Sequence, residues 1–298
     1  MPPEGRYKVW GEKSGTIVQI TILGAESLGA RSMATVVEAG GRTVLIDPGV
    51  ALAPRRFGLP PHPAEREAAA GIRRAILAWL PRATDVVFTH YHGDHVPLSE
   101  PDPHQIPLAG FTLPEGCRVL AKGPDMLSRR SSGRRSDIEK ATGDPLQNAE
   151  GTDDGVVACS LPVPHGGRAG AVMMVAVREG EQCCVHASDT QLLSDEAVRL
   201  IESWRPTVVF SSGPPLYLTS ITGAEEEEAF CRAIHGAEIA GPLILDHHLM
   251  RSEKGLAWIR DLGRAGGRPV VSAAEFMGRP NRLLEAGRRE LWSGTQGR

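Results

Sequence analysis

Four side chains of the kinds that bind metals stand within six positions of the sequence. His90, His92, Asp94 and His95 occur in the stretch THYHGDHVPL, directly after the apolar run DVVF. Imidazole nitrogens and carboxylate oxygens are ligands that zinc and similar divalent cations accept. Alternate residues of an extended segment point the same way, so His90 and His92 can share one metal, while Asp94 and His95 can reach a second. A polar loop of unusual composition is the alternative, and we favour the metal site.

One turn cannot complete two coordination spheres, so further ligands must come from other parts of the chain. Ligand-type side chains recur where β-rich runs stop: His165 in VPHGG, Asp189 in ASDTQ, and His247 and His248 in LILDHHL. Strand ends are where α/β folds build their sites. Asp47 in LIDPG has the same placement and is expected to hold a ligand histidine in position.

The elements that must position these residues alternate along the whole chain. Strands are expected at 16–23, 33–39, 42–49, 85–88, 117–121, 155–166, 171–177, 182–190, 207–213, 242–248 and 268–273, and helices at 63–80, 194–204 and 224–237. Gly93 and a helix beginning at Val96 are expected to sharpen the turn of the metal motif. We predict an α/β fold with four αββα layers. No linker interrupts the pattern, so one domain is expected over 1–298, with its core at about 16–280 and a C-terminal helix to 298.

The ordered motifs resemble those of the metallo-β-lactamase superfamily. HYHGDH is preceded by LIDPG and followed in order by PHG, SDT and DHH. The resemblance implies that His90, His92 and His165 hold one metal, and that Asp94, His95 and a late histidine hold the other. It also implies that Asp189 bridges the two metals and that Asp47 supports the site without binding a metal.

The last motif offers two histidines where the resemblance needs one. We favour His247 as the ligand, because related nuclease-like members place theirs at the same spacing after the strand. His248 is then expected to donate a proton, which makes Asp94, Asp189 and His248 the expected catalytic residues. His186 is expected to support the ligands from behind, with simple packing in the core as an equal alternative.

Four further segments are similar to one uncharacterised branch of that superfamily, described only as metal-dependent hydrolases. They are LGAESLGARSMATVVE, IDPGVALAPRRFGLPPHP, LILDHHLMR and AAEFMGRPNRLLEAGRRELW. Together they extend the resemblance over nearly the whole chain. No reaction is assigned to that branch, so it implies fold and metal but no substrate.

The expected activity is hydrolysis by a hydroxide that bridges two divalent metals, zinc being favoured over iron or manganese. Phosphodiesters or other phosphoesters are the favoured substrates, because Asp94 completes a second site and arginines flank two of the expected site loops. Esters, lactones and thioesters are alternatives. A non-haem di-iron oxidoreductase on the same ligands is the second hypothesis, and a metal-free scaffold is the third.

Two basic segments carry the arginines of this argument. The run SRRSSGRRS, at 128–136, begins a segment that is helical at its rear, and Arg55 and Arg56 lie in APRRFGLPPHP. Each is either a solvated loop or a lid that binds a phosphate or carboxylate through bidentate arginine contacts. The sequence leaves both alternatives open.

Composition narrows the partners and the compartment. The 298 residues have a net charge of −3, so no general polyanion-binding surface is indicated. Nucleic acid is a possible partner without support in the sequence. The same holds for a second copy of the chain. The five cysteines form no CxxC motif. No apolar run is long enough for a signal peptide or a membrane span. We therefore expect a cytoplasmic protein without membrane contact that acts on a small molecule or phosphoester.

Overall fold

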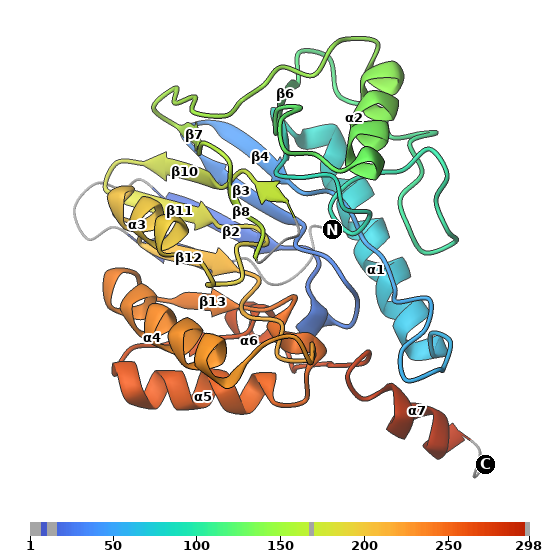
Figure 1. The fold of residues 1–298 in the computed structure, drawn as a ribbon. Helices are drawn as coiled ribbons and strands as arrows, with labels where there is room; N and C mark the ends of the chain where they lie inside the picture. The colour runs from blue at the N-terminus through green and yellow to red at the C-terminus, as the bar shows by residue number, and fades with distance from the viewer. Residues whose placement is uncertain (1–6, 11–16, 167–169, 296–298) are drawn as a thin grey trace.

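The computed structural model describes residues 7–10, 17–166 and 170–295, and contains two six-stranded sheets (Figure 1). The strands of the first sheet lie side by side in chain order: β1 Tyr7–Trp10, β2 Ile17–Ile22, β3 Thr35–Ala39, β4 Arg42–Ile46, β5 Asp85–Phe88 and β6 Arg118–Ala121. Strands β1 to β4 are antiparallel, whereas β4, β5 and β6 run parallel. The carboxyl ends of β4 and β5 therefore meet at one edge.

The second sheet has the order β14-β13-β12-β11-β10-β7. Its strands are β7 Val157–Cys159, β10 Val175–Glu179, β11 Gln182–His186, β12 Val208–Ser211, β13 Leu243–Leu245 and β14 Val270–Val271. Strands β11 to β14 are parallel, and β10 pairs antiparallel with both β7 and β11. A separate small hairpin joins β8 Val163–Pro164 to β9 Ala171–Val172.

Helices cover the outer face of each sheet. The α-helices are α1 Pro63–Trp79, α2 Arg129–Thr142, α3 Asp195–Ser203, α4 Gly223–Ile239, α5 Gly255–Gly266, α6 Ala273–Phe276 and α7 Arg288–Thr295; the short 3-10 helices are η1 Glu26–Leu28, η2 Leu80–Arg82 and η3 Leu249–Arg251. In Figure 1, α1 and α2 lie on one side of the paired sheets, and α3, α4 and α5 on the other. The predicted four-layer αββα fold is confirmed.

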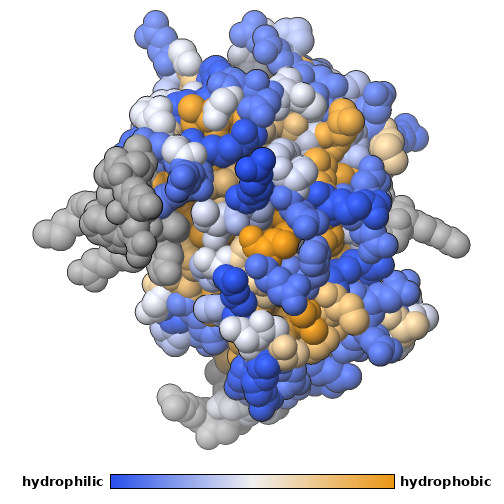
Figure 2. All heavy atoms as spheres, turned by 90° about the vertical axis from the view of Figure 1, so that its left-hand side faces the viewer, coloured by the Kyte–Doolittle hydropathy of each residue, from blue (hydrophilic) through white to orange (hydrophobic). Residues whose placement is uncertain are grey.

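The face shown in Figure 2 is largely polar, and its apolar side chains form small separate patches. Broad exposed apolar patches commonly mark docking or membrane surfaces. Within the part of the chain that the structure describes, no helix is both long and apolar enough to cross a bilayer.

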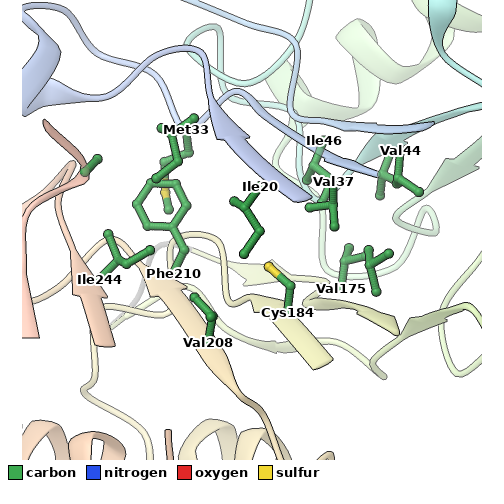
Figure 3. Close-up of a cluster of buried hydrophobic side chains, with 14 of the residues drawn as sticks. Ile20, Met33, Val37, Val44, Ile46, Val175, Cys184, Val208, Phe210 and Ile244 are labelled. Atoms are coloured by element: carbon green, nitrogen blue, oxygen red, sulfur yellow. The ribbon is translucent and has the colours of Figure 1, made fainter. Parts of the chain in front are cut away.

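The central core lies between the two sheets. Ile20, Val37 and Ile46 from the first sheet face Cys184 and Phe210 from the second (Figure 3). Two outer cores lie between the sheets and the helices: one includes Ile72 and Ile76 of α1, the other Ile259 of α5. The central strands β5, β12 and β13 are buried on both faces, which explains their continuous apolar runs in the sequence.

Several predicted elements differ from those observed. No helix begins at Val96: residues 93–95 form a turn, and the N–H of Val96 donates to the carbonyl of His92 at 3.2 Å. The reason is Pro97, because a residue before proline is disfavoured in the helical conformation. The basic run at 128–136 is helical from Arg129 onward, capped by Ser128, whose hydroxyl accepts from the N–H of Ser131. The predicted strand at 155–166 is two short strands, β7 and β8, and β1 was not predicted.

Candidate metal centre

Five loops that follow strands of the two sheets and of the small hairpin bring the predicted residues together. Asp47 follows β4 and the HYHGDH motif follows β5; His165 follows β8, Asp189 follows β11, and His247 and His248 follow β13. Asp47, Ser188 and His247 have positive φ angles of 48°, 51° and 42°. Left-handed backbone is unfavourable for such residues and concentrates at functional sites, where the surrounding structure holds it in place.

Asp47 anchors the turn of the motif. Its Oδ1 accepts from the backbone N–H of Thr89 at 2.9 Å, and its Oδ2 accepts from the Thr89 hydroxyl at 2.6 Å. The same Oδ2 lies 2.8 Å from Nδ1 of His95. A carboxylate at Nδ1 places the proton there and leaves the Nε2 lone pair available, as in many metal-binding histidines.

A first cluster unites His90, His92, His165 and Asp189, which offer ligand atoms all within 4.8 Å of one another. Oδ2 of Asp189 lies 3.6 Å from Nε2 of His90 and 3.1 Å from Nε2 of His165. His90, His165 and Asp189 are buried, with exposed fractions of 3%, 4% and 1%. This is the set that the resemblance to the superfamily implied for one metal.

A second cluster unites Asp94, His95 and His247. Nε2 of His247 lies 3.4 Å from Oδ2 of Asp94 and 3.7 Å from Oδ1 of Asp189. Nε2 of His95 lies 3.5 Å from Oδ2 of Asp189. Asp189 therefore faces histidines of both clusters: Oδ2 lies beside His90, His165 and His95, and Oδ1 beside His247.

Unpartnered polar atoms test whether these residues fit a metal. Nε2 of His90, Nε2 of His95 and Oδ1 of Asp189 are buried and have no hydrogen-bond partner among the described residues. Buried polar atoms without partners are costly and rare, so several of them around one point call for an explanation. A divalent cation accepts lone pairs from each of these atoms, and the donor set fits it.

Burial favours the neutral, metal-binding form of four of the clustered imidazoles. It lowers the pKa of His92 and of His248 to about 4, and lowers the pKa of His90 and of His247 well below the usual range. Burial also lowers the pKa of His95, but the carboxylates of Asp189 and Asp47 outweigh it and raise that pKa well above normal.

The two ligand-type carboxylates stay ionised. Burial alone raises the pKa of Asp189, but the surrounding histidines, His248 first, outweigh it and hold that pKa well below normal. Burial likewise raises the pKa of Asp94, and the hydrogen bond with His247 and the charge of His95 outweigh it. Neutral imidazoles beside ionised carboxylates are the forms to which a cation binds.

His248 and His186 occupy different surroundings. Nε2 of His248 lies 3.1 Å from Oδ2 of Asp189, and its Nδ1 lies 3.2 Å from the hydroxyl of Tyr217. His186 is buried at the end of β11, where its Nε2 lies 3.0 Å from the carbonyl of Met33. Its expected support of the ligands stays a prediction, as do the metal-binding and catalytic roles of the other residues.

Sequence analysis did not single out Thr89, Tyr217 or Arg251. Thr89 stands directly before the motif, and its position at a strand end was the available signal. Tyr217 and Arg251 come from loops whose approach to the site depends on tertiary structure alone. Asp246 links two other segments to the loop after β13: its carboxylate accepts from the N–H groups of Ser27 and Ala273, each at 2.9 Å.

A cavity of about 430 Å³ opens beside Asp94. Helix α2 contributes Arg130 and Arg134 to its lining, and Arg31 lines it from the loop before β3. Nη1 of Arg134 donates to the carbonyl of Tyr91 at 2.8 Å, which fixes this guanidinium beside the metal motif. Arg55 and Arg56, the other predicted basic pair, do not line this cavity.

Comparison with known proteins was made on sequence and on structure. The sequence model of the Metallo-beta-lactamase superfamily matches residues 29–196, more than half of the chain. The chain belongs to the metallo-beta-lactamase superfamily.

It is 48% identical to a UPF0282 protein of Methanosarcina mazei over 278 residues, which covers 92% of each chain. It is 34% identical to a UPF0282 protein of Pyrococcus furiosus over 303 residues, which covers 94% of each. The superfamily and its uncharacterised branch, expected from the motifs, are confirmed.

Two solved structures resemble the chain at low sequence identity. One is a metal-dependent hydrolase of the beta-lactamase superfamily, with a TM-score of 0.48, 12% identity and coverage of 85% of this chain and 94% of the other. The second is an isothiocyanate hydrolase from Delia radicum gut bacteria, with a TM-score of 0.48, 15% identity and coverage of 82% and 94%.

Proposed function

We propose that this superfamily member is a hydrolase that uses two divalent metals, zinc in the first place, with phosphodiesters as its favoured substrates. The observation that supports it most is the set of buried, unpartnered atoms of His90, His95 and Asp189 around one point. His90, His92 and His165 would hold one metal, and Asp94, His95 and His247 the other, with Asp189 between them. When bound, such metals polarise the scissile group and lower the pKa of water.

The chain's own residues orient the site and move the proton. Asp47 holds His95 through Nδ1 and thereby directs its Nε2 into the centre. His248 is proposed as the group that protonates the leaving group. Because burial lowers its pKa to about 4, the ring is neutral near pH 7. It would give its Nε2 proton to the leaving group while Nδ1 takes the proton of the Tyr217 hydroxyl, 3.2 Å away, and solvent water would then return a proton to the Tyr217 oxygen.

The preference for phosphodiesters rests on the cavity beside Asp94. Arg130 and Arg134 lie four residues apart on α2 and both line it. Burial and the charge of Arg130 lower the pKa of Arg134, so an anion placed between the two guanidinium groups relieves their repulsion. The basic run thus lines the proposed substrate cavity as a helix.

The charges of the cavity favour a singly charged substrate. Three arginines and three acids line it, and the acids are Asp94, Glu100 and Asp102. A phosphodiester carries one negative charge and a phosphomonoester nearly two, so the diester meets less repulsion from these carboxylates. The two arginines match its non-bridging oxygens through directional N–H contacts.

A substrate panel tests this proposal. Zinc-loaded protein is assayed without oxygen on bis-p-nitrophenyl phosphate, on lactones and on thioesters; turnover of the phosphodiester is expected. Arg134→Ala should raise KM by about tenfold or more through loss of a charged hydrogen bond, while Lys140→Ala, at an exposed site on the same helix, leaves it unchanged. Silence on the phosphodiester with turnover of another class would overturn the preference, and activity that needs oxygen would favour the oxidoreductase alternative.

A further inference from the structure

Arg251 ends the 3-10 turn that follows the two late histidines, and its side chain is buried, with 4% exposed. Its Nη2 lies 3.1 Å from Oδ2 of Asp94 and 2.7 Å from Nε2 of His247. These two atoms are themselves only 3.4 Å apart. The guanidinium therefore donates into the centre of the second cluster.

The contacts of Arg251 use the atoms that a second metal would need. Nη2 of Arg251 lies 2.7 Å from Nε2 and 3.4 Å from Nδ1 of His247, so the guanidinium lies against the imidazole ring in the space next to the ligand atom. The guanidinium is also always charged, so it repels a divalent cation at hydrogen-bond distance. The guanidinium and a second metal would therefore compete for the space between Asp94 and His247.

The first cluster has no such occupant. Within residues 17–166 and 170–295, the recorded ion-pair contacts of Asp189 are all with histidines. Nε2 of His90 is buried there without a hydrogen-bond partner, whereas Nε2 of His247 has Arg251. The second metal position therefore has a positively charged side chain beside its ligand atoms, and the first has none among the described residues.

We propose that Arg251 is a built-in cation of the second metal position, which competes with the second metal and makes metal uptake ordered. The inference rests on the proposed two-metal function and adds to it that the two sites differ in affinity. The first metal binds at His90, His92, His165 and Asp189 without competition. The second binds only when the guanidinium leaves Asp94 and His247.

The same surroundings give the displaced guanidinium other partners. Nε of Arg251 lies 3.5 Å from Oε2 of Glu26, and Nη1 lies 3.3 Å from the hydroxyl of Tyr217. Glu26 is buried, with 1% exposed, and reaches Arg251 from η1. Glu26 and Tyr217 can therefore keep hold of the guanidinium when it leaves the two metal ligands.

Metal stoichiometry measured by equilibrium dialysis against a series of free Zn²⁺ concentrations tests this inference without an activity assay. Wild type should bind one zinc tightly and a second at least about tenfold more weakly. Arg251→Met should tighten the second site by about tenfold or more, because a unit charge beside it is gone. Arg251→Lys keeps the charge and should retain the weak second site.

Arg31→Met is the matched control. Arg31 pairs with Glu285 at 2.6 Å and belongs to the same group of charges, but it makes no recorded contact with Asp94 or His247 in the described chain. Its loss should leave the second site weak. Circular dichroism checks folding. Because burial raises the pKa of Glu26 to about 8, this side chain is largely protonated near pH 7, and Arg251→Met does not leave it as an unpaired buried charge.

The outcomes separate the inference from the function on which it rests. Two equally tight zinc sites in wild type, or a second site that stays weak in a folded Arg251→Met, would overturn the role of Arg251 and leave the metal function standing. Absence of any zinc binding in wild type would overturn both. If Arg251→Met does not fold, a tight second site in Arg251→Lys or two equal sites in wild type still contradicts the inference.

Discussion

At the scale of single residues, Asp47 links the backbone of the metal motif to the chemistry of one ligand. It accepts from Thr89 and from Nδ1 of His95, and so fixes both the turn and the proton of the imidazole. Its φ of 48° is a conformation that asparagine adopts almost as readily as aspartate. Substitution of Asp47 by asparagine and by alanine therefore separates its effect on the turn from its effect on the proton of His95.

We predict that Asp47→Asn folds nearly as well as wild type but binds zinc about 10–100-fold more weakly. The amide keeps an oxygen for the Thr89 N–H, but it can turn an N–H group toward Nδ1 of His95, which moves the ring proton to Nε2 and blocks the ligand atom. Asp47→Ala should also lose about 1–3 kcal/mol of stability, because Thr89 loses its acceptors. Zinc titration and chemical denaturation measure the two effects. Unchanged zinc affinity in Asp47→Asn would contradict the claim that Asp47 keeps the proton of His95 on Nδ1.

Most of the centre could be predicted at this scale, because metal ligands have a restricted set of types and spacings. His90, His92, Asp94 and His95 reveal themselves by crowding, and His165, Asp189 and His247 by their places after β-rich runs. Arg251 could not be predicted, since an arginine after a strand is common and its contact with Asp94 spans 157 positions of sequence. Tyr217 was missed for the same reason.

At the scale of elements, the loop after β4 packs directly on the turn after β5. Gly49 lies so close that a Cβ atom there would be 2.4 Å from the carbonyl carbon of His95 and from the nitrogen of Val96. Both of those atoms belong to the backbone, which cannot rotate away. The approach of the two segments thus depends on this glycine.

Gly49→Ala should therefore destabilise the protein by about 1–3 kcal/mol or more and weaken zinc binding as well, because the motif must shift to admit the methyl group. Gly133→Ala is the control: it lies inside α2 with open space around its Cβ, and should stabilise the helix by about 0.5–1 kcal/mol. Thermal melting and zinc titration of both variants measure this. Equal stability of Gly49→Ala and wild type would be incompatible with the packing described.

Elements were predicted well where one local signal dominates. Helix α1 has proline at its first turn, a capping box from His62 and Glu65, and apolar residues at helical spacing. The prediction of a helix beginning at Val96 was wrong, because Pro97 disfavours the helical conformation at the residue before it. Strand β1 lies in a segment of polar composition, and its pairing with β2 is a tertiary contact that no local pattern specifies.

At the scale of the whole molecule, alternating strands and helices predicted the layers but not the order of the strands in each sheet. In the second sheet, β7 pairs with β10 although two short strands lie between them in sequence. Such pairings depend on non-local contacts. The single domain and a homo-oligomer stay predictions.

The burial of several imidazoles makes the stability of the metal-free protein depend on pH. Burial lowers the pKa of His92 and His248 to about 4 and lowers the pKa of His90 and of His247 well below the usual range. In the unfolded chain these groups titrate near pH 6.5. Between about pH 6.5 and 4 the unfolded chain therefore binds more protons than the folded one, and the free energy of unfolding falls as the pH is lowered.

Three groups act in the opposite sense but do not reverse this: His95, Glu26 and Asp246, whose pKa burial raises. His186, whose pKa burial lowers, acts in the same sense as the four histidines. His95 has a raised pKa, so its contribution is complete below about pH 6.5 and is lost only at higher pH. Glu26, with a pKa near 8, opposes the four histidines as a single group. We expect the Tm of chelator-treated protein to fall from pH 7 to pH 5, and less so in His92→Gln. A Tm that is constant or rises over this range would contradict the assignment of neutral buried imidazoles.

The central claim is that the clustered histidines and aspartates form a metal centre. Anomalous diffraction from crystals grown with zinc, recorded on both sides of the zinc absorption edge, tests it most directly. We predict a strong anomalous peak within coordination distance of His90, His92, His165 and Asp189, and a weaker one near Asp94 and His247 at the same zinc concentration. A fully ordered site without any peak among these side chains would contradict the account.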